Sequence, residues 1–475
     1  MNCRLLSPIL LICAALSLAA CDDDSDATAE GEAHRSALGT VAAAVEQRPG
    51  NPDEGYRALV NEPYVSCGIP YNAYRRVADP APQDLRLPGR TGLNAELPYA
   101  LTHHINADGV GIVSNNCLTC HAAEIEGELI VGLGNEFGDF TQDPSRTVLQ
   151  SGTYVRGTAE TAAWQHFADR IAGIAPYTRT ATVGVNPATN LTWALMAHRD
   201  PETLAWSDTP LIDPPPTEPL PVSVPPWWGM RKKNAMFYTT IGRGDHAHFM
   251  LLASMLCVED TSELAAIDAY APDIRAFIAS LEAPAYPFAI DTALAARGER
   301  LFARDCAACH GTYGANESYP NKVYALSEVG TDPTYATAAT DGSRDRFYEW
   351  VARSPYGTAD SAAPAPGYIA PPLDGVWATA PYLHNGSVPD MRTLLDSRTR
   401  PTYWRHRLAP RAYLPADMGW AHDVLDQGQD NEPDPAARRL IYDTTRRGYG
   451  NGGHTYSDHL SADERDALLE YLKTL

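Results

Sequence analysis

Apolar residues recur at helical spacing at the end of the chain. Leu468, Tyr471 and Leu472 form one stripe, and such a stripe marks the buried face of an amphipathic helix. A serine and a glutamate stand three positions apart before it, which is the spacing of a capping box at a helix N-terminus. These two residues are Ser461 and Glu464. The pattern therefore predicts a closing helix over residues 460–475.

Two further segments have the same period. Leu294, Gly298 and Leu301 fall on one helical face shortly before Cys306. Another helix is expected to begin at Pro272, because proline is favoured in the first helical turn, and to stop before the pair Ala283-Pro284. Its apolar residues recur at helical spacing and are Ile274, Phe277, Ile278 and Leu281.

These elements predict a mainly α fold with two tandem units. The proline-bearing run 283–291 is the expected linker, so the first unit covers residues 51–290 and the second covers residues 291–475. Both units are expected to carry long irregular insertions. One of them, residues 213–226, is too rich in proline for a helix or a central strand.

The first twenty residues have the pattern of a signal peptide. Arg4 precedes the short apolar run Leu5 to Ala20, which is too short to span a membrane as a mature helix. Its end, Leu18-Ala19-Ala20-Cys21, resembles the bacterial lipobox, which implies cleavage after residue 20 and a lipid on Cys21. An ordinary signal peptide with an incidental cysteine is the alternative. The interpretation favours a periplasmic protein anchored by lipid to the inner or the outer membrane.

Residues 21–50 are acidic and poor in large apolar side chains, so they are expected to form a flexible tether. The whole chain has a formal net charge of −22. That charge argues against nucleic acid as a partner and favours a basic redox partner.

The pattern Cys-x-x-Cys-His occurs twice, as Cys117-Leu-Thr-Cys120-His121 and Cys306-Ala-Ala-Cys309-His310. This pattern is typical of c-type haem attachment, in which the cysteines form thioethers and the histidine binds the iron. A thiol redox or zinc site is the alternative for a single copy. Two copies, each ending in histidine, favour two covalently bound c-type haems, called haem 1 and haem 2 in chain order.

The remaining cysteines fit this interpretation. Of nine cysteines, four belong to the two motifs, Cys3 and Cys13 leave with the signal peptide, and Cys21 takes the lipid. This leaves Cys67 and Cys257, which are expected to form a disulfide in an oxidising compartment. Two separate buried thiols are the alternative.

Haem 2 needs an axial ligand opposite His310. In small cytochromes c this ligand usually lies on a loop shortly before the closing helix, and here a glycine-rich loop from Gly448 ends in His454. His454 is therefore the first choice and would make haem 2 bis-histidine. His384 is the rival ligand, or otherwise a residue near the haem edge. Two weaker candidates are Met391 and Met418.

No comparable ligand loop precedes the helix that closes the first unit. Aromatic and methionine residues are expected to cover haem 1 there without binding its iron, and an open iron binds O2 or peroxide. His246 or His248 would then act as acid or base, and Arg243 would polarise a peroxide bond. The alternative is Met250 as sixth ligand, which would make haem 1 a plain electron carrier. The residues expected to cover the haem are Trp227, Trp228, Met230, Met236, Phe237 and Tyr238.

With these residues in view, the chain resembles the bacterial dihaem cytochrome c peroxidase superfamily over residues 95–475, most closely the branch of the dihaem rubber oxygenases. The resemblance rests on the two haem motifs, on the loop ending in His454, and on a specific stretch. That stretch reads Ala370-Pro-Pro-Leu-Asp-Gly-Val-Trp377-Ala-Thr-Ala-Pro-Tyr-Leu-His384-Asn-Gly-Ser-Val-Pro389.

The resemblance implies that haem 1 is the catalytic centre with His121 as proximal ligand, and that haem 2, held by His310 and a ligand at the position of His454, transfers electrons. It also implies an electron relay through Trp227 or Trp228, and a distal pocket lined by Phe237 or Tyr238.

Two functions follow from these expectations. The first is an oxidoreductase whose haem 1 handles peroxide or O2, with peroxide favoured over rubber because this chain is much shorter than the rubber oxygenases. The second is a membrane-tethered electron-transfer cytochrome without catalytic activity. In either case a small cytochrome or a quinol-linked donor is the expected redox partner.

Overall fold

The computed structural model of this chain describes residues 44–78, 82–357, 364–408 and 411–475. The predicted signal peptide, Cys21 and most of the acidic tether lie outside these ranges. Within the described ranges, no helix is both long and apolar enough to cross a membrane.

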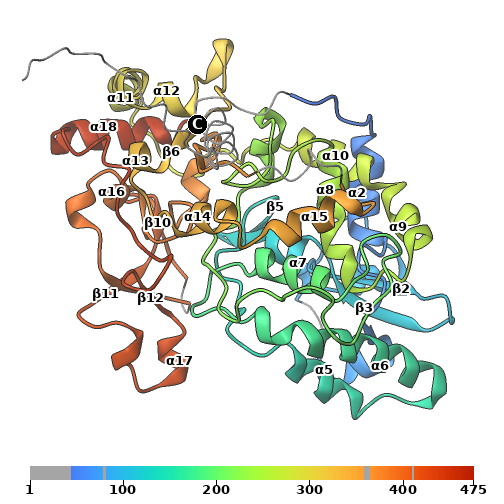
Figure 1. The fold of residues 1–475 in the computed structure, drawn as a ribbon. Helices are drawn as coiled ribbons and strands as arrows, with labels where there is room; N and C mark the ends of the chain where they lie inside the picture. The colour runs from blue at the N-terminus through green and yellow to red at the C-terminus, as the bar shows by residue number, and fades with distance from the viewer. Residues whose placement is uncertain (1–43, 79–81, 358–363, 409–410) are drawn as a thin grey trace, which may run out of the picture.

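Helices are the longest elements of the structure (Figure 1). In chain order they are α2 Pro52–Asn61, α3 Tyr71–Val77, α4 Leu118–His121, α5 Ser145–Gly152, α6 Gly157–Ile174, α7 Ala188–Ala197, α8 His246–Met250, α9 Thr261–Asp268, α10 Ala271–Ser280, α11 Thr292–Asp305, α12 Ala307–His310, α13 Leu326–Val329, α14 Thr334–Thr340, α15 Asp345–Arg353, α16 Met391–Leu394, α17 Pro435–Arg438 and α18 Ala462–Leu472.

The strands are short and pair antiparallel, in two three-stranded sheets of order β1-β3-β2 and β11-β8-β12 and in the pairs β4-β5, β6-β7 and β9-β10. Their bounds are β1 Ile69–Pro70, β2 Leu101–Ile105, β3 Gly111–Asn115, β4 Ala122–Ile125, β5 Glu128–Val131, β6 Val323–Ala325, β7 Gly367–Ile369, β8 Tyr403–His406, β9 Tyr413–Leu414, β10 Gly419–Trp420, β11 His422–Leu425 and β12 Ile441–Asp443. The described residues thus combine helices with short strands at intervals, and residues 213–226 contain neither helix nor strand, as predicted.

Two helix pairs cross at a glycine, one in each half of the chain. In the second half α11 packs on α18, and a Cβ atom at Gly298 would lie 1.9 Å from the carbonyl oxygen of Ala467. In the first half α2 packs on α10, and a Cβ atom at Gly55 would lie 1.9 Å from the carbonyl oxygen of Asp273. Any side chain would push either pair apart, so both crossings require glycine. Figure 1 shows the two pairs on opposite sides of the molecule.

The helix ends are fixed by the signals seen in the sequence. Ser461 and Glu464 form the predicted capping box at the start of α18, and α10 carries Pro272 in its first turn. The helix α2 was not predicted, although its start has the same kind of signal. The Asn51 side chain accepts hydrogen bonds from the backbone N–H groups of residues 53 and 54, and Pro52 follows it.

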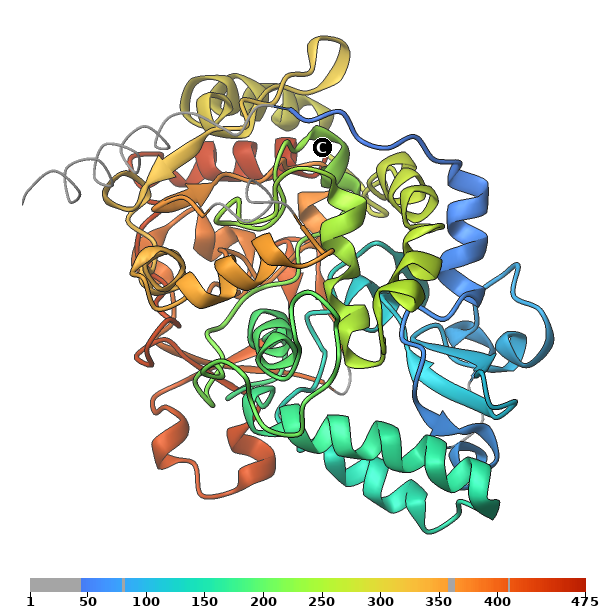
Figure 2. The ribbon, with the colours of Figure 1, turned by 45° about the vertical axis from the view of Figure 1, so that its right-hand side comes forward.

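The hydrophobic cores combine residues from both sides of residue 290. One core packs Phe167 and Trp193 of the first half against Phe347 and Trp350 of α15, and Figures 1 and 2 show α15 lying over α7. A second core packs Trp228 with residues of the second half, among them Trp377. The two halves therefore bury shared apolar surface.

The predicted disulfide is present. Cys67 and Cys257 are bonded, with Cα atoms 5.2 Å apart and a sequence separation of 190 residues. Both residues are buried in the core that contains Phe167 and Trp193. The bond ties the segment before β1 to the segment that follows α8, and so closes a loop that contains the first haem motif.

Candidate haem sites

Both Cys-x-x-Cys-His motifs form one helical turn with the same backbone bonds. The N–H of His121 donates to the carbonyl of Cys117 at 3.1 Å, and the N–H of His310 donates to that of Cys306 at 3.0 Å. Residues three apart lie on the same face of a helical turn, so each motif directs both sulfur atoms to one side. This is the arrangement that two thioether bonds to one haem require.

The imidazole of His310 is oriented by a backbone carbonyl. Its Nδ1 lies 2.9 Å from the carbonyl oxygen of Pro371, which can only accept, so Nδ1 carries the proton. The other nitrogen, Nε2, is then the one with a lone pair for a metal. Burial lowers the pKa of His310, and the Pro371 carbonyl partly offsets this shift. The neutral imidazole is the form that binds iron.

His454 faces His310. Their ring centroids are 6.1 Å apart. Two metal–nitrogen bonds of about 2 Å each, with the ring centres about 1 Å behind the nitrogens, place two such centroids about 6 Å apart. The Nδ1 atom of His454 is buried without a hydrogen-bond partner, and burial, followed by the charges of His310 and Arg400, lowers its pKa to about 4. The pair therefore fits one iron held between two neutral imidazoles.

The loop that carries His454 is held by backbone hydrogen bonds and by one arginine. His454 has a left-handed backbone with φ of 46°, and its N–H donates to the carbonyl of Val329 at 2.7 Å. The Arg400 guanidinium donates to the carbonyls of Asn451 and Gly453 at 2.7 Å and to that of His454 at 3.1 Å. The sequence interpretation missed Arg400, because its place in the chain gives no sign of this role.

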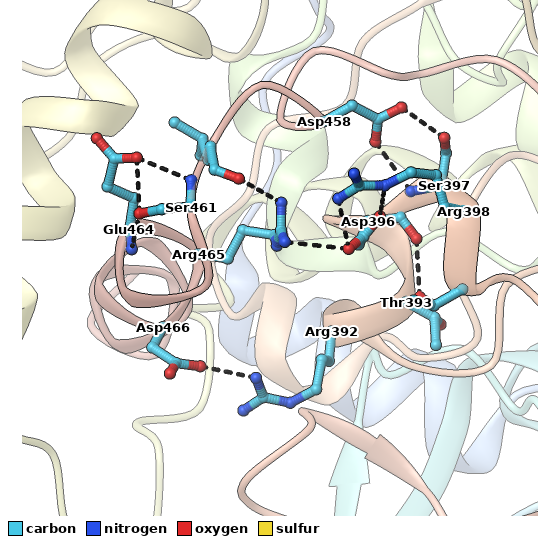
Figure 3. A network of polar contacts seen from close by, with 12 residues as sticks. Arg392, Thr393, Asp396, Ser397, Arg398, Asp458, Ser461, Glu464, Arg465 and Asp466 are labelled. Atoms are coloured by element: carbon cyan, nitrogen blue, oxygen red, sulfur yellow. Dashed lines mark hydrogen bonds and ion pairs between the residues drawn. The ribbon is translucent and has the colours of Figure 1, made fainter.

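A polar network supports the far side of this loop (Figure 3). Ser397 binds the carboxylate of Asp458 through its backbone N–H at 2.9 Å and through its hydroxyl. Arg465 of α18 lies 3.1 Å from the carboxylate of Asp396. These contacts fix the segment between the loop and the closing helix, so the position of His454 depends on α18 as well as on the loop.

His384 has a different place. Its ring is buried and stacks on Tyr368 with centroids 4.2 Å apart, and Tyr238 and Tyr335 lie at 6.2 and 6.5 Å. Its Nε2 atom is buried without a hydrogen-bond partner. The next residue, Asn385, donates to the carbonyls of Gly448 and Gly450 at 2.9 and 3.0 Å. The residue after His384 thus holds the glycine-rich loop that leads to His454.

The two weaker ligand candidates lie in the core. Met391 and Met418 are buried in the cluster that contains Trp377, and the backbone N–H of Met391 donates to the carbonyl of Met418 at 3.2 Å.

At the first motif an indole packs against the histidine. The rings of His121 and Trp227 stack with centroids 4.8 Å apart. The contact is fixed by Gly132, whose N–H donates to the carbonyl of His121 and whose carbonyl accepts from the N–H of Trp227, both at 2.8 Å. Burial lowers the pKa of His121 to about 4, and its Nδ1 makes no well-formed hydrogen bond. The imidazole is neutral and can bind iron.

The two motifs are joined by a short packed route. Trp228 follows Trp227 in the chain, and its indole N–H donates to the carbonyl of Asp374 at 2.7 Å. Gly229 packs on Pro372, where a Cβ atom would lie 3.1 Å from the proline ring. Pro372 follows Pro371, whose carbonyl holds His310. The route from His121 through residues 227–229 and 371–372 to His310 is therefore made of direct contacts.

The remaining residues predicted for the first site lie close together in the sequence, but each of them contacts a different neighbour. Phe237 has φ of 66° and packs on Phe249 with centroids 5.6 Å apart. Arg243 donates to the carbonyl of Thr240 at 3.2 Å. His246 is buried, with Nε2 3.4 Å from the carbonyl oxygen of Asn234, whereas His248 is half-buried.

A buried acid, Glu136, lies between the two motifs in the sequence and was not predicted. Glu136 accepts hydrogen bonds from the Ser223 hydroxyl at 2.7 Å and from the N–H of Val224 at 3.2 Å. Among the residues that the structure describes, no cation pairs with it. Burial raises the pKa of this carboxyl to about 8. A single glutamate in a sequence gives no sign of such burial.

We expect Glu136 to make the stability of the protein pH-dependent. Because its folded pKa of about 8 lies above the ordinary value of 4.5, the folded state holds the proton more tightly. Stability is therefore lost as the pH rises from 4.5 towards 8, by about 3 kcal/mol between pH 4.5 and 7. Glu136→Gln keeps the acceptor oxygen and should remove this dependence, as measured by denaturant unfolding at pH 5 and pH 7. An equal pH dependence in the two proteins would contradict the assignment.

The second half of the chain is similar to two protein-family models. Residues 295–383, which include the second motif, match the model described as cytochrome c. Residues 367–405, which include His384, match the model described as RoxA-like, cytochrome c-like. The chain therefore contains a cytochrome c domain, which implies covalently bound c-type haem with iron and a role in haem-based electron transfer or oxidoreduction.

The chain is similar to two curated relatives from Sinorhizobium fredii (strain NBRC 101917 / NGR234), whose printed names call them uncharacterized proteins. The protein named y4iM is 32% identical over 235 residues, which are 42% of this chain and 52% of the relative. The protein named y4iJ is 31% identical over 248 residues, which are 39% of each. The chain thus spans about half the length of the first relative and less of the second.

Proposed function

We propose that this chain is a dihaem c-type cytochrome oxidoreductase built from two cytochrome c-like units. The two motifs with equal backbone geometry and the two glycine helix crossings support one haem in each unit, at Cys117 and Cys120 and at Cys306 and Cys309. His310 and His454 would hold haem 2 as a bis-histidine, electron-transferring centre. Their 6.1 Å ring separation is the observation that carries this assignment, and it favours His454 over His384.

Haem 1 would be the reactive centre, with His121 as its proximal ligand. No histidine ring of the described residues contacts His121 as His454 contacts His310, and the indole of Trp227, which stacks on the face of the His121 ring, lies beside this ligand. A haem iron with an open axial position binds peroxide or O2. Phe237 and Phe249 would restrict access to this position, and the packed route through Trp227 and Trp228 would carry electrons between the sites.

An open haem 1 beside a closed haem 2 also fits the resemblance to the dihaem peroxidases. We propose peroxide as the substrate ahead of O2, because its reduction is the simpler reaction. His246 would be poorly placed as an acid or base, because its Nε2 already contacts the Asn234 carbonyl. The half-buried His248 and Arg243 remain the proposed polar groups of this reaction.

A membrane-tethered electron carrier is the second candidate. Met230 and Met250 are half-buried and pack against the cluster that contains Leu118 and Trp227, so a thioether ligand for haem 1 is within the same region. In both functions we propose export to the periplasm, lipid attachment through Cys21, and a small cytochrome or a quinol-linked donor as partner, on the sequence signals at the N-terminus and the net charge of −22.

Carbon monoxide added to the fully reduced holoprotein should change the optical spectrum of one haem of the two. The open position proposed for haem 1 binds this ligand, whereas a second imidazole excludes it from haem 2. The His454→Ala variant calibrates the result, because it should bind carbon monoxide at both haems. Peroxide consumption with an artificial electron donor, at a rate above that of free haem, should accompany the change.

A wild-type spectrum that carbon monoxide leaves unchanged would contradict the reactive haem. Both irons would then keep strong axial ligands, and the electron carrier would be the better description.

A further inference from the structure

Three basic side chains gather beside the first motif, from three elements that pack on one another. Lys233 follows the 3-10 turn η4 Trp227–Lys232, His246 opens α8, and Arg275 lies on α10, which packs against both η4 and α8. Their charges act on each other. Burial is the main cause that lowers the pKa of His246, and the positive charges of Arg275 and Lys233 lower it further.

Two of these basic side chains, Lys233 and Arg275, are half-buried and have no acidic partner among the described residues. The Nε atom of Arg275 is buried without a hydrogen-bond partner, and burial lowers the pKa of Lys233 to about 8. No carboxylate in the described part of the chain forms an ion pair with either residue. The nearest acidic neighbour of His246, Asp245, is already bound to Arg48.

Other buried arginines in this chain show the contrast. Arg90 donates to the carbonyls of Val60, Pro98 and Leu101, and Arg170 binds the carboxylate of Glu259. A buried nitrogen of a cationic group that has no acceptor is costly. An acidic protein with a net charge of −22 has carboxylates in excess, so three basic groups brought together without one favour an anion supplied from outside the chain.

The cluster lies at the edge of the first haem site. Ile274 and Ile278, on the same helix as Arg275, are buried together with Leu118 of the first motif and with Trp227. Burial, then the charge of Glu62 and then that of Cys117 raise the pKa of Tyr270, one turn before Ile274, so this hydroxyl lies near Cys117. The cations therefore border the space beside Cys117.

We propose that Lys233, His246 and Arg275 form a cradle that binds the two propionate carboxylates of the haem attached at Cys117 and Cys120. This inference rests on the proposed function, since it requires a haem at the first motif. An arginine guanidinium binds a carboxylate through two parallel hydrogen bonds, and a lysine ammonium neutralises a second one. His246 then becomes a positioning residue of the haem and is no longer a candidate acid or base for peroxide.

The test uses the holoprotein and the double variant Lys233→Gln/Arg275→Gln. The control is Arg231→Gln, which removes one positive charge from the neighbouring 3-10 turn but whose guanidinium is exposed and lies 3.8 Å from Asp374. Intact mass gives the number of haems, and an optical redox titration gives the midpoint potential of each. The resonance Raman bending modes of the propionates report their hydrogen bonds directly.

We expect two haems in every protein, a lower midpoint potential of haem 1 in the double variant, and an unchanged haem 2. Removing positive charge favours the ferric iron, so the direction is fixed. The propionate modes of haem 1 should shift in the double variant and not in Arg231→Gln. Arg275→Lys, which keeps the charge, should retain the potential and lose the bidentate hydrogen bonding.

Each contrary result has its own meaning. A wild-type mass with one haem overturns the proposed function itself. Two haems with unchanged potentials and unchanged propionate modes overturn only the cradle. If the double variant does not assemble, two single variants carry the same test. Lys233→Gln removes one cation and should lower the potential of haem 1, and Arg275→Lys keeps both charges and should shift only the propionate modes.

Discussion

Replacing His454 with alanine is expected to convert the ferric haem held by His310 from a low-spin to a high-spin spectrum. The imidazole of His454 faces that of His310 at the separation that one shared iron requires, and no other imidazole of the described residues makes a ring contact with His310. Loss of this strong ligand leaves the iron five-coordinate or bound by water. Optical and electron paramagnetic resonance spectra of the holoprotein measure the change.

The methionine variant gives a second, graded result. His454→Met should keep haem 2 six-coordinate and raise its midpoint potential, because a thioether ligand favours ferrous iron more than a second imidazole does. The matched control is His384→Ala, which removes a buried histidine that stacks on Tyr368. That control should leave the haem 2 spectrum unchanged. A His454 variant with the wild-type spectrum, or a His384 variant without it, would reverse the ligand assignment.

Removing the disulfide is expected to cause a large loss of stability. The bond between Cys67 and Cys257 closes a loop with a sequence separation of 190 residues. In the chain-entropy description, a bond that closes a loop of this length restricts the unfolded chain enough to stabilise the folded state by about 5 kcal/mol. The double variant Cys67→Ala/Cys257→Ala should therefore unfold at a much lower denaturant concentration than wild type, with two haems still bound.

A thiol reductant provides the control for this measurement. Reduction should lower the midpoint of wild type to that of the double variant and leave the variant unchanged, because the thioether bonds to haem are not disulfides. A difference below about 1 kcal/mol between oxidised wild type and the variant would show that the unfolded chain gains little freedom without the bond.

Features set by neighbouring residues were open to prediction from the sequence. A haem motif places its cysteines and histidine within one helical turn, so its chemistry is complete within five residues. The helices α10, α11 and α18 were predicted because their apolar period and their proline or capping-box signals are local. The disulfide followed from counting, since only Cys67 and Cys257 remained without another role.

Some features were not predicted although local signals existed. The helix α2 begins with Asn51 and Pro52 and has acidic residues in its first turn, a pattern that predicts a helix N-terminus. Its Gly55 matches Gly298 in position at a helix crossing. The partner of each glycine is far away in sequence, so the crossing itself is visible only when both helices are in place.

By itself, then, the sequence predicted two haem-attachment motifs, where the main helices run and which cysteines pair. Only the tertiary structure decided that His454 and not His384 faces His310, that Trp227 stacks on His121, and that Glu136 is buried without a cation. The physical reason is the distance along the chain between the residues that interact. Covalent attachment and helix formation depend on residues a few positions apart, whereas an axial pair, a ring stack or a buried charge depends on which distant segments share the same small volume.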